Sequence, residues 1–134
     1  MKKACTAVTN DKLIVLKENR SKVIFDNKKQ IKVEKIHVDG CQITSGIRCD
    51  YLMLTDSLEY FIELKGQDLD HAIEQLKTTI SKLSDDPKKG KKKSFIICTR
   101  SPLNSATIQN LQLKFRKHFN SELIVKSSPL KHSI

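Results

Sequence analysis

The sequence predicts an α/β domain in which a mixed central β-sheet is flanked by helices. Three observations predict this class: short β-favouring apolar runs, two amphipathic stretches of helix length, and their order along the chain. That order is strands, helix, strand, helix, strand, which favours helices packed on a sheet. With 134 residues the chain has the length of a single domain, 1–134, and the recognisable elements span about 31–126.

The N-terminal half is rich in expected strands. Residues 31–38 form one run, and residues 51–54 and 58–64 form two more around a turn near 56–57. Residues 1–25 leave two alternatives open. Their apolar runs LIVL and KVIF fit either strands or the inner face of a helix.

The C-terminal half alternates helices and strands. Apolar residues at helical spacing predict a helix over about 69–84, with Asp68 as its N-cap and Pro87 preventing continuation. A buried strand is expected over 94–99, a second helix over 105–119 and a strand over 122–126. We expect the tail from Ser127 onward to be frayed.

Composition narrows the class of protein. Hydrophobic residues make up 38% and charged residues 30%, which fits a globular chain and disfavours a disordered one. No apolar run approaches the roughly 20 residues that a membrane span needs, and the first residues lack a signal-like apolar core. The sequence therefore predicts no membrane association and a cytoplasmic location.

The four cysteines are expected to be reduced thiols, mostly buried, because they form no Cys-x-x-Cys pair and the expected compartment is reducing. They are Cys5, Cys41, Cys49 and Cys98. A zinc site built from His37, Cys41 and Cys49 is disfavoured because a fourth ligand is missing.

Positive charge is concentrated in the C-terminal part. Residues 1–85 hold 14 basic and 13 acidic groups, a difference of +1, and residues 86–134 hold 11 and 2, a difference of +9. Such asymmetry is typical of a polyanion-binding face, for nucleic acid first and an acidic membrane second. Among nucleic acids we expect DNA rather than RNA as the partner. A solvated surface loop is the alternative. The residues expected to contact phosphates are Lys88, Lys89, Lys91, Lys92, Lys93 and Arg100.

The expected hairpin over 50–65 brings two carboxylates together. If its loop has two or four residues, the numbers of cross-strand partners sum to 113, and Asp50 lies opposite Glu63. A three-residue loop would place Asp50 opposite Ile62 instead. Lys65 shares the face of Glu63 because side chains alternate along a strand.

Asp, Glu and Lys at one end of a hairpin suit the hydrolysis of a phosphodiester. Two opposed carboxylates are tolerated when a cation bridges them, and hard oxygen ligands favour Mg²⁺. A bound Mg²⁺ lowers the pKa of a water and stabilises the charge that develops on phosphorus. Lys65 is placed to orient that water. A Glu63–Lys65 salt bridge or solvated strand ends are the structural alternatives.

The stretch from Asp50 through YLMLTDSLEYFI to Glu63-Leu64-Lys65 resembles the Asp…(Asp/Glu)-x-Lys signature of the PD-(D/E)XK nuclease superfamily. The resemblance covers about residues 36–100 and implies the restriction-endonuclease-like fold. It implies that Asp50, Glu63 and the carbonyl of Leu64 bind Mg²⁺, for which Mn²⁺ can substitute, and that Lys65 assists the water. Some branches add a glutamine from the next helix, and Gln75 occupies a comparable place.

The same resemblance raises one open point. Members usually open with a helix whose acidic residue supplements the site, and no segment of this chain is clearly that helix. Glu18, Glu34 and Asp39 are the candidates for the additional carboxylate.

The function that these observations predict is a Mg²⁺-dependent phosphodiesterase, a DNA endonuclease, acting alone or as a homodimer. The alternative is a non-catalytic module that binds nucleic acid or protein, including a defence or immunity protein, and that retains the nuclease scaffold.

Overall fold

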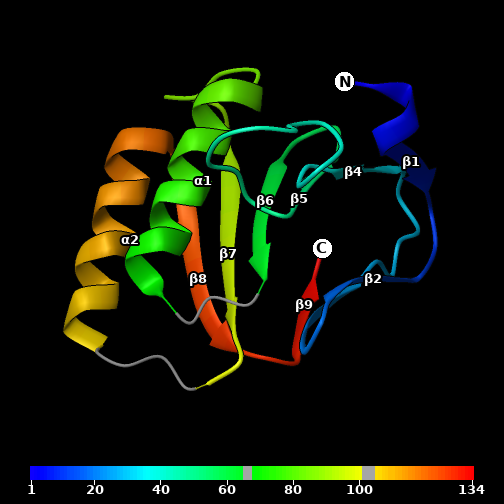
Figure 1. Cartoon of the computed structure of the whole chain (residues 1–134). Coiled ribbons are helices and arrows are strands. Elements are labelled where there is room, and N and C mark those ends of the chain that lie inside the picture. The colour runs from blue at the N-terminus through cyan, green and yellow to red at the C-terminus, as the bar shows by residue number, and fades with distance from the viewer. Residues whose placement is uncertain (65–67, 101–104) are drawn as a thin grey trace.

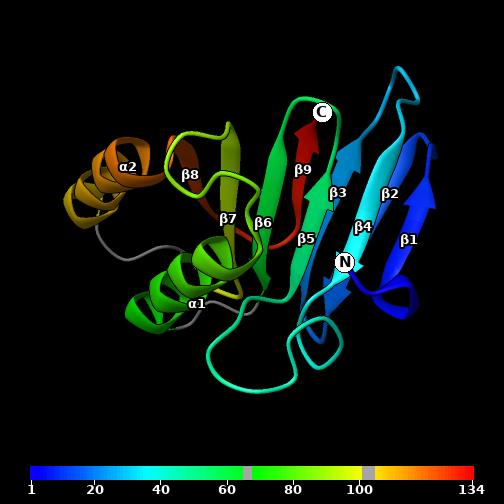
Figure 2. The same cartoon turned by 90° about the horizontal axis from the view of Figure 1, so that it is seen from above.

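The computed structural model describes residues 1–64, 68–100 and 105–134. It is an α/β structure of three layers: two helices, a six-stranded sheet and a three-stranded sheet (Figure 1). The α/β class with a mixed sheet, predicted from the sequence, is therefore confirmed. Both helices lie on one face of the large sheet, and the small sheet lies on the other (Figure 2).

The large sheet has the strand order β1-β4-β5-β6-β7-β8. β1, β4, β5 and β6 pair antiparallel, whereas β6, β7 and β8 run parallel. The carboxyl ends of these three parallel strands therefore lie at one end of the sheet. The strands are β1 Thr6–Thr9, β4 Val33–His37, β5 Tyr51–Leu54, β6 Glu59–Leu64, β7 Lys92–Cys98 and β8 Ser121–Ser127.

The small sheet has the order β2-β3-β9, formed by β2 Leu13–Glu18, β3 Ser21–Asp26 and β9 Leu130–Ser133. The two runs in residues 1–25 are thus strands rather than a helix. β2 alternates exposed and buried side chains, which is the pattern of a strand with one face in the core. The expectation of a frayed tail was wrong, because β9 pairs in parallel with β3.

The helices begin and end close to the predicted bounds. They are α1 Leu69–Leu83 and α2 Ser105–Phe119. The side chain of Asp68 accepts a hydrogen bond from the backbone N–H of His71 at 3.1 Å, which is the predicted N-cap. Residues 1–64 contain no α-helix, only a 3₁₀ turn at Lys3–Cys5. The opening helix that the resemblance implies is therefore not found there.

Two apolar clusters hold the layers together. One lies between the helices and the large sheet and includes Leu52, Phe61 and Leu76. The other lies between the two sheets and includes Phe25, Tyr60 and Phe95, whose rings contact one another. Because the large sheet is covered on both faces, β6 and β7 are almost continuously buried along their length.

The cysteines differ from the expectation. Cys5 and Cys41 form a disulfide, with their Cα atoms 5.7 Å apart, so the prediction of reduced thiols was wrong for this pair. Their separation of 36 residues carries no sequence signal, and only the folded chain brings them together. Cys49 and Cys98 are free and buried, as expected. Disulfides are typical of oxidising compartments, and the cytoplasmic location stays a prediction.

Among the described residues, no helix is long and apolar enough to cross a membrane.

Candidate active site

The hairpin of β5 and β6 has the predicted register. Its loop comprises the four residues 55–58, closed by a hydrogen bond from the Thr55 N–H to the Leu58 carbonyl at 3.0 Å. Leu52 lies opposite Phe61 and Leu54 opposite Glu59, so partner numbers sum to 113. Asp50 precedes β5 directly, and its N–H donates to the carbonyl of Ile62 at 3.1 Å. The regular pairing ends at Tyr51 opposite Ile62, and beyond it a side-chain hydrogen bond joins Asp50 and Glu63.

Both carboxylates are buried. Asp50 and Glu63 are each 6% exposed, although Asp and Glu are rarely buried without a partner. One carboxylate oxygen of Asp50 accepts a hydrogen bond from the N–H of Leu64 at 2.8 Å. Asp50 and Glu63 each lie two residues from a residue of the helix-side cluster, Leu52 and Phe61 respectively. Since residues two apart on a strand share a face, both acids lie on the helix-covered face of the sheet. We call this end of the sheet, where β6 ends at Glu63 and Leu64, the carboxylate end.

The surroundings of Asp50 disfavour the charged form of its side chain. Burial raises the pKa of Asp50. Hydrogen bonds from the Leu64 N–H and with the Glu63 side chain lower this pKa and oppose part of the rise, whereas the negative charges of Glu18 and Asp39 raise it further. The neighbouring Cys49 thiol has a pKa raised to about 12, mainly by burial and partly by Glu63 and Asp50. Cys49 is therefore a protonated, structural thiol at neutral pH.

Two of the three candidates for an additional carboxylate lie near this end. The charges of both Glu18, at the end of β2, and Asp39, just after β4, act on Asp50. Asp39 also accepts a hydrogen bond from the Nε of Arg48 at 2.8 Å. Glu34 pairs with Leu54 and therefore lies toward the other end of the sheet, so it does not belong to the site.

Helix α1 holds the segment that leads into Asp50. The side-chain amide of Gln75 donates to the carbonyl of Arg48 at 3.0 Å, and the hydroxyl of Thr79 accepts from the N–H of Cys49 at 2.8 Å. Gln75 therefore lies near the carboxylates, as predicted, but its contact is with the backbone of Arg48, two residues before Asp50. Gln75 positions the loop before Asp50 in this structure.

Lys65, predicted to assist the water, lies outside the described residues. Leu64 is described as the last residue of β6 and is buried. In the part of the chain that the structure describes, no group of three or more His, Cys, Asp or Glu side chains forms a ready metal cluster.

The lysine-rich loop lies at the opposite end of the sheet. β7 runs parallel to β6 and begins with Lys92 beside Glu59, four residues before Glu63. At the usual strand rise this places the loop about 13 Å along the sheet from the carboxylates. We call this opposite end, with Glu59, Lys92 and residues 86–93, the lysine end. The sequence could not separate the two ends, because the direction of β7 relative to β6 was unknown.

Lys92 has a structural role in place of the predicted phosphate contact. It is 3% exposed, and its Nζ donates to the carbonyls of Asp86, Gly90 and Phe119. Lys93 is half-buried and contacts the ring of His132 at 3.2 Å. Lys88, Lys89 and Lys91 are exposed.

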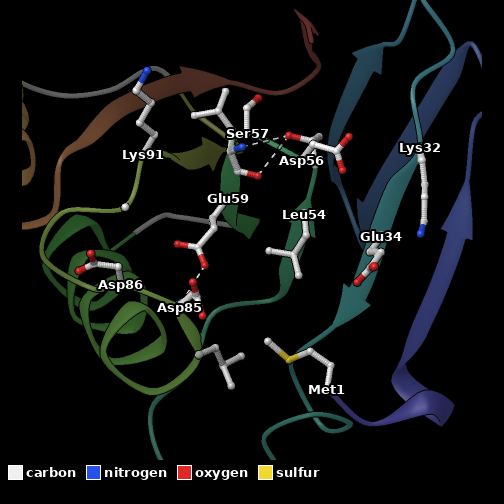
Figure 3. A pocket seen from close by; sticks show the side chains of 14 residues that line it. Met1, Lys32, Glu34, Leu54, Asp56, Ser57, Glu59, Asp85, Asp86 and Lys91 are labelled. Atoms are coloured by element: carbon white, nitrogen blue, oxygen red, sulfur yellow. Dashed lines mark hydrogen bonds between the residues drawn. The ribbon is translucent and has the colours of Figure 1, made fainter.

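The lysine end contains a hollow of about 510 Å³ with an acidic lining (Figure 3). Glu59 points toward Asp85 in it and accepts hydrogen bonds from the Asp85 N–H at 2.9 Å and from the Ser84 hydroxyl. Its charged lining residues are Lys32, Lys91, Glu34, Asp56, Glu59, Asp85 and Asp86. Five carboxylates against two lysines make this hollow a poor site for phosphate.

Exposed arginines lie at the carboxylate end instead. The hydroxyl of Ser128 contacts the carbonyl of Arg20 at 3.3 Å, and that of Ser127 contacts the carbonyl of Arg100 at 3.5 Å. Ser127 is the last residue of β8 and Ser128 follows it, so both lie at the carboxyl end of β8, which is also the end where Glu63 lies. Arg100 was among the predicted phosphate contacts, whereas Arg20 was missed. It occupies the tight turn between β2 and β3, where Asn19 adopts a φ of 49°.

Comparisons with protein-family models, curated proteins and solved structures find no match to this chain.

Proposed function

We propose that this chain is a Mg²⁺-dependent nuclease of the restriction-endonuclease-like class that hydrolyses phosphodiester bonds in DNA. The observation that carries the proposal is the buried pair Asp50 and Glu63 at the end of β6. Two carboxylates side by side in the interior are unfavourable for folding alone. Their presence is explained if they bind a cation that offsets their charge.

The residues present fit a magnesium ion. Asp50 and Glu63 supply carboxylate oxygens and Leu64 a carbonyl oxygen, which are the hard ligands that Mg²⁺ prefers. The raised pKa of Asp50, caused mainly by burial, fits the same role, because a divalent cation bound at the carboxylate would favour its charged form. Bound there, Mg²⁺ would lower the pKa of a water and stabilise negative charge on the phosphate.

The chain's own groups supply the remaining functions. The Leu64 N–H fixes the orientation of the Asp50 carboxylate, and Gln75 and Thr79 fix the backbone before it. Such fixed positions lower the entropic cost of binding and reaction. Lys65 is proposed to orient the attacking water, and Arg20 and Arg100 to contact the phosphate backbone of the substrate.

The test is cleavage of supercoiled plasmid and of labelled duplex, branched and single-stranded oligonucleotides, with Mg²⁺, Mn²⁺ or EDTA. We expect wild-type protein to cut with either metal and not with EDTA. Glu63→Gln should reduce the rate by on the order of 10²-fold or more while binding is retained, because an electrostatic contribution to the transition state is removed. RNA oligonucleotides of the same sequence test the preference for DNA.

The matched control is Glu59→Gln, the same change on the same strand at the lysine end, which should leave cleavage unchanged. Binding without cutting in either metal would contradict the proposal and favour the non-catalytic module. Neither binding nor cutting would favour a protein-binding role for the scaffold.

A further inference from the structure

We propose that two copies of this chain associate through strand β8, which pairs antiparallel with itself about Ile124. This inference is independent of the proposed function, because it rests on the edge of the large sheet and not on the carboxylates. β8 is the terminal strand of that sheet, and β7 is its one neighbour in the strand order.

The backbone of β8 leaves alternate residues facing outward. Toward β7, the Lys92 N–H donates to the carbonyl of Asn120, and the Ser128 N–H donates to the carbonyl of Cys98. Even-numbered residues therefore face β7, and odd-numbered residues turn their N–H and C=O groups to the open edge. The side chain of Gln112 confirms this direction, since it donates to the Leu123 carbonyl from the open side at 3.0 Å.

The sequence of β8 is self-complementary about its centre. It reads Ser-Glu-Leu-Ile-Val-Lys-Ser from Ser121 to Ser127. An antiparallel pairing about Ile124 places Glu122 opposite Lys126 of the second copy, on both sides of the two-fold axis. Both side chains are exposed, and opposed charges at this spacing attract.

The same pairing satisfies the outward backbone groups. Leu123 lies opposite Val125 of the second copy, and each residue can donate to and accept from the other once the Gln112 side chain, which donates to the Leu123 carbonyl in the single chain, turns away. The two-fold axis generates the same pair of hydrogen bonds a second time, between Val125 of the first copy and Leu123 of the second. Because the groups that bond are those that face the open edge, no bond between β7 and β8 has to break.

The surroundings of β8 provide room for a second strand. A hollow of about 880 Å³ lies along residues 122–126, between the strand and the flank of α2 that carries Gln112, Leu113 and Arg116. Leu113 is 68% exposed, the highest fraction among the large apolar side chains that the structure describes. A second copy seated at this edge would cover it.

The two edge strands of the large sheet differ in how well they are protected against pairing with a strand of another chain. β1, at the other edge, is four residues long, and short edge strands are a common protection against pairing. β8 has seven residues and contains no proline. A long regular edge strand is the typical site for strand addition.

The experiment is sedimentation velocity of the full chain at pH 8 over a range of concentrations. Wild-type protein should sediment as a species of twice the 15.3 kDa chain mass. Glu122→Lys places lysine opposite lysine, and Lys126→Glu places glutamate opposite glutamate. Each variant alone should dissociate at a concentration at least about tenfold higher than wild type does.

Mixing makes the test specific for this register. The two single variants combined in equal amounts should form a heterodimer, because every opposed pair then has opposite charges. The double variant Glu122→Lys/Lys126→Glu should regain the wild-type dimer. A wild-type monomer at all concentrations up to about 100 µM, where specific interfaces form, would overturn the proposal. So would single variants that dimerise like wild type, or a mixture that stays monomeric.

Folding of the variants is checked by circular dichroism and thermal unfolding. Both positions are exposed, so we expect unchanged spectra. If one single variant fails to fold, the other still decides the question, since it too opposes like charges across the two-fold axis, and the double variant must then restore the dimer that it loses.

Discussion

The two ends of strand β6 show how differently the same residue type can be used. Glu59 begins the strand and Glu63 lies near its end. Glu59 accepts hydrogen bonds from the Asp85 N–H and the Ser84 hydroxyl. Glu63 is buried beside a second carboxylate, Asp50, whose pKa is raised mainly by burial.

The positively charged side chains at the two ends also differ in their contacts and exposure. At the lysine end, three backbone carbonyls accept from Lys92, and the exposed lysines border an acidic hollow. At the carboxylate end, Arg20 and Arg100 are exposed beside the carboxyl ends of the parallel strands. The buried cation of the lysine end thus holds the fold, whereas the two arginines at the carboxylate end are exposed, and we propose that they contact a ligand.

The largest effect should come from removing the structural lysine. Lys92→Met leaves three backbone carbonyls without their donor, and we expect the free energy of unfolding to fall by about 3 kcal/mol. Urea unfolding followed by circular dichroism measures it. Lys88→Met, an exposed position in the same loop, should change stability by less than about 0.5 kcal/mol. Equal effects of the two changes would show that the bonds of Lys92 contribute little.

A second prediction compares the phosphate contacts of the two ends at equal charge. Arg20→Ala/Arg100→Ala should weaken binding of a labelled DNA duplex in EDTA about tenfold and reduce the salt dependence by about one unit per lost contact. Lys88→Ala/Lys89→Ala removes the same charge at the lysine end and should leave both quantities nearly unchanged. Fluorescence anisotropy at several salt concentrations gives both. If the lysine variant lost more affinity for DNA than the arginine variant, the lysine-rich loop would be the DNA-binding face.

The sequence predicted local elements better than it predicted which ends meet. The loop of residues 55–58 and the alternation of β5 and β6 were enough to predict the register of the hairpin and the contact between the Asp50 and Glu63 side chains just beyond it. The parallel direction of β7 was not available from local patterns, so charges from both ends were assigned to one face. The Cys5–Cys41 disulfide and the pairing of β9 with β3 were missed for the same reason, because both join segments far apart in the chain.

The smallest effect, and the one that most directly distinguishes the ends, is the pH dependence of Asp50. Burial, with the charges of Glu18 and Asp39, raises its pKa in the fold. A raised carboxyl pKa contributes stability that is present below the ordinary value, about 3.9, and is lost as the pH rises through the folded value. Asp50→Asn escapes that loss and still offers an oxygen to the Leu64 N–H.

Without metal, Asp50→Asn should therefore unfold a few degrees above wild type at pH 7, and the difference should shrink as the pH falls below 4. Added Mg²⁺ should raise the unfolding temperature of wild type and not that of the variant, because ligand binding stabilises the fold that binds it. Asp56→Asn, an exposed carboxylate in the hairpin loop at the lysine end, should show neither behaviour. If Asp50→Asn instead lowers the unfolding temperature at every pH, the buried carboxylate is held by the fold for its own stability, and the contrast between the two ends of β6 disappears.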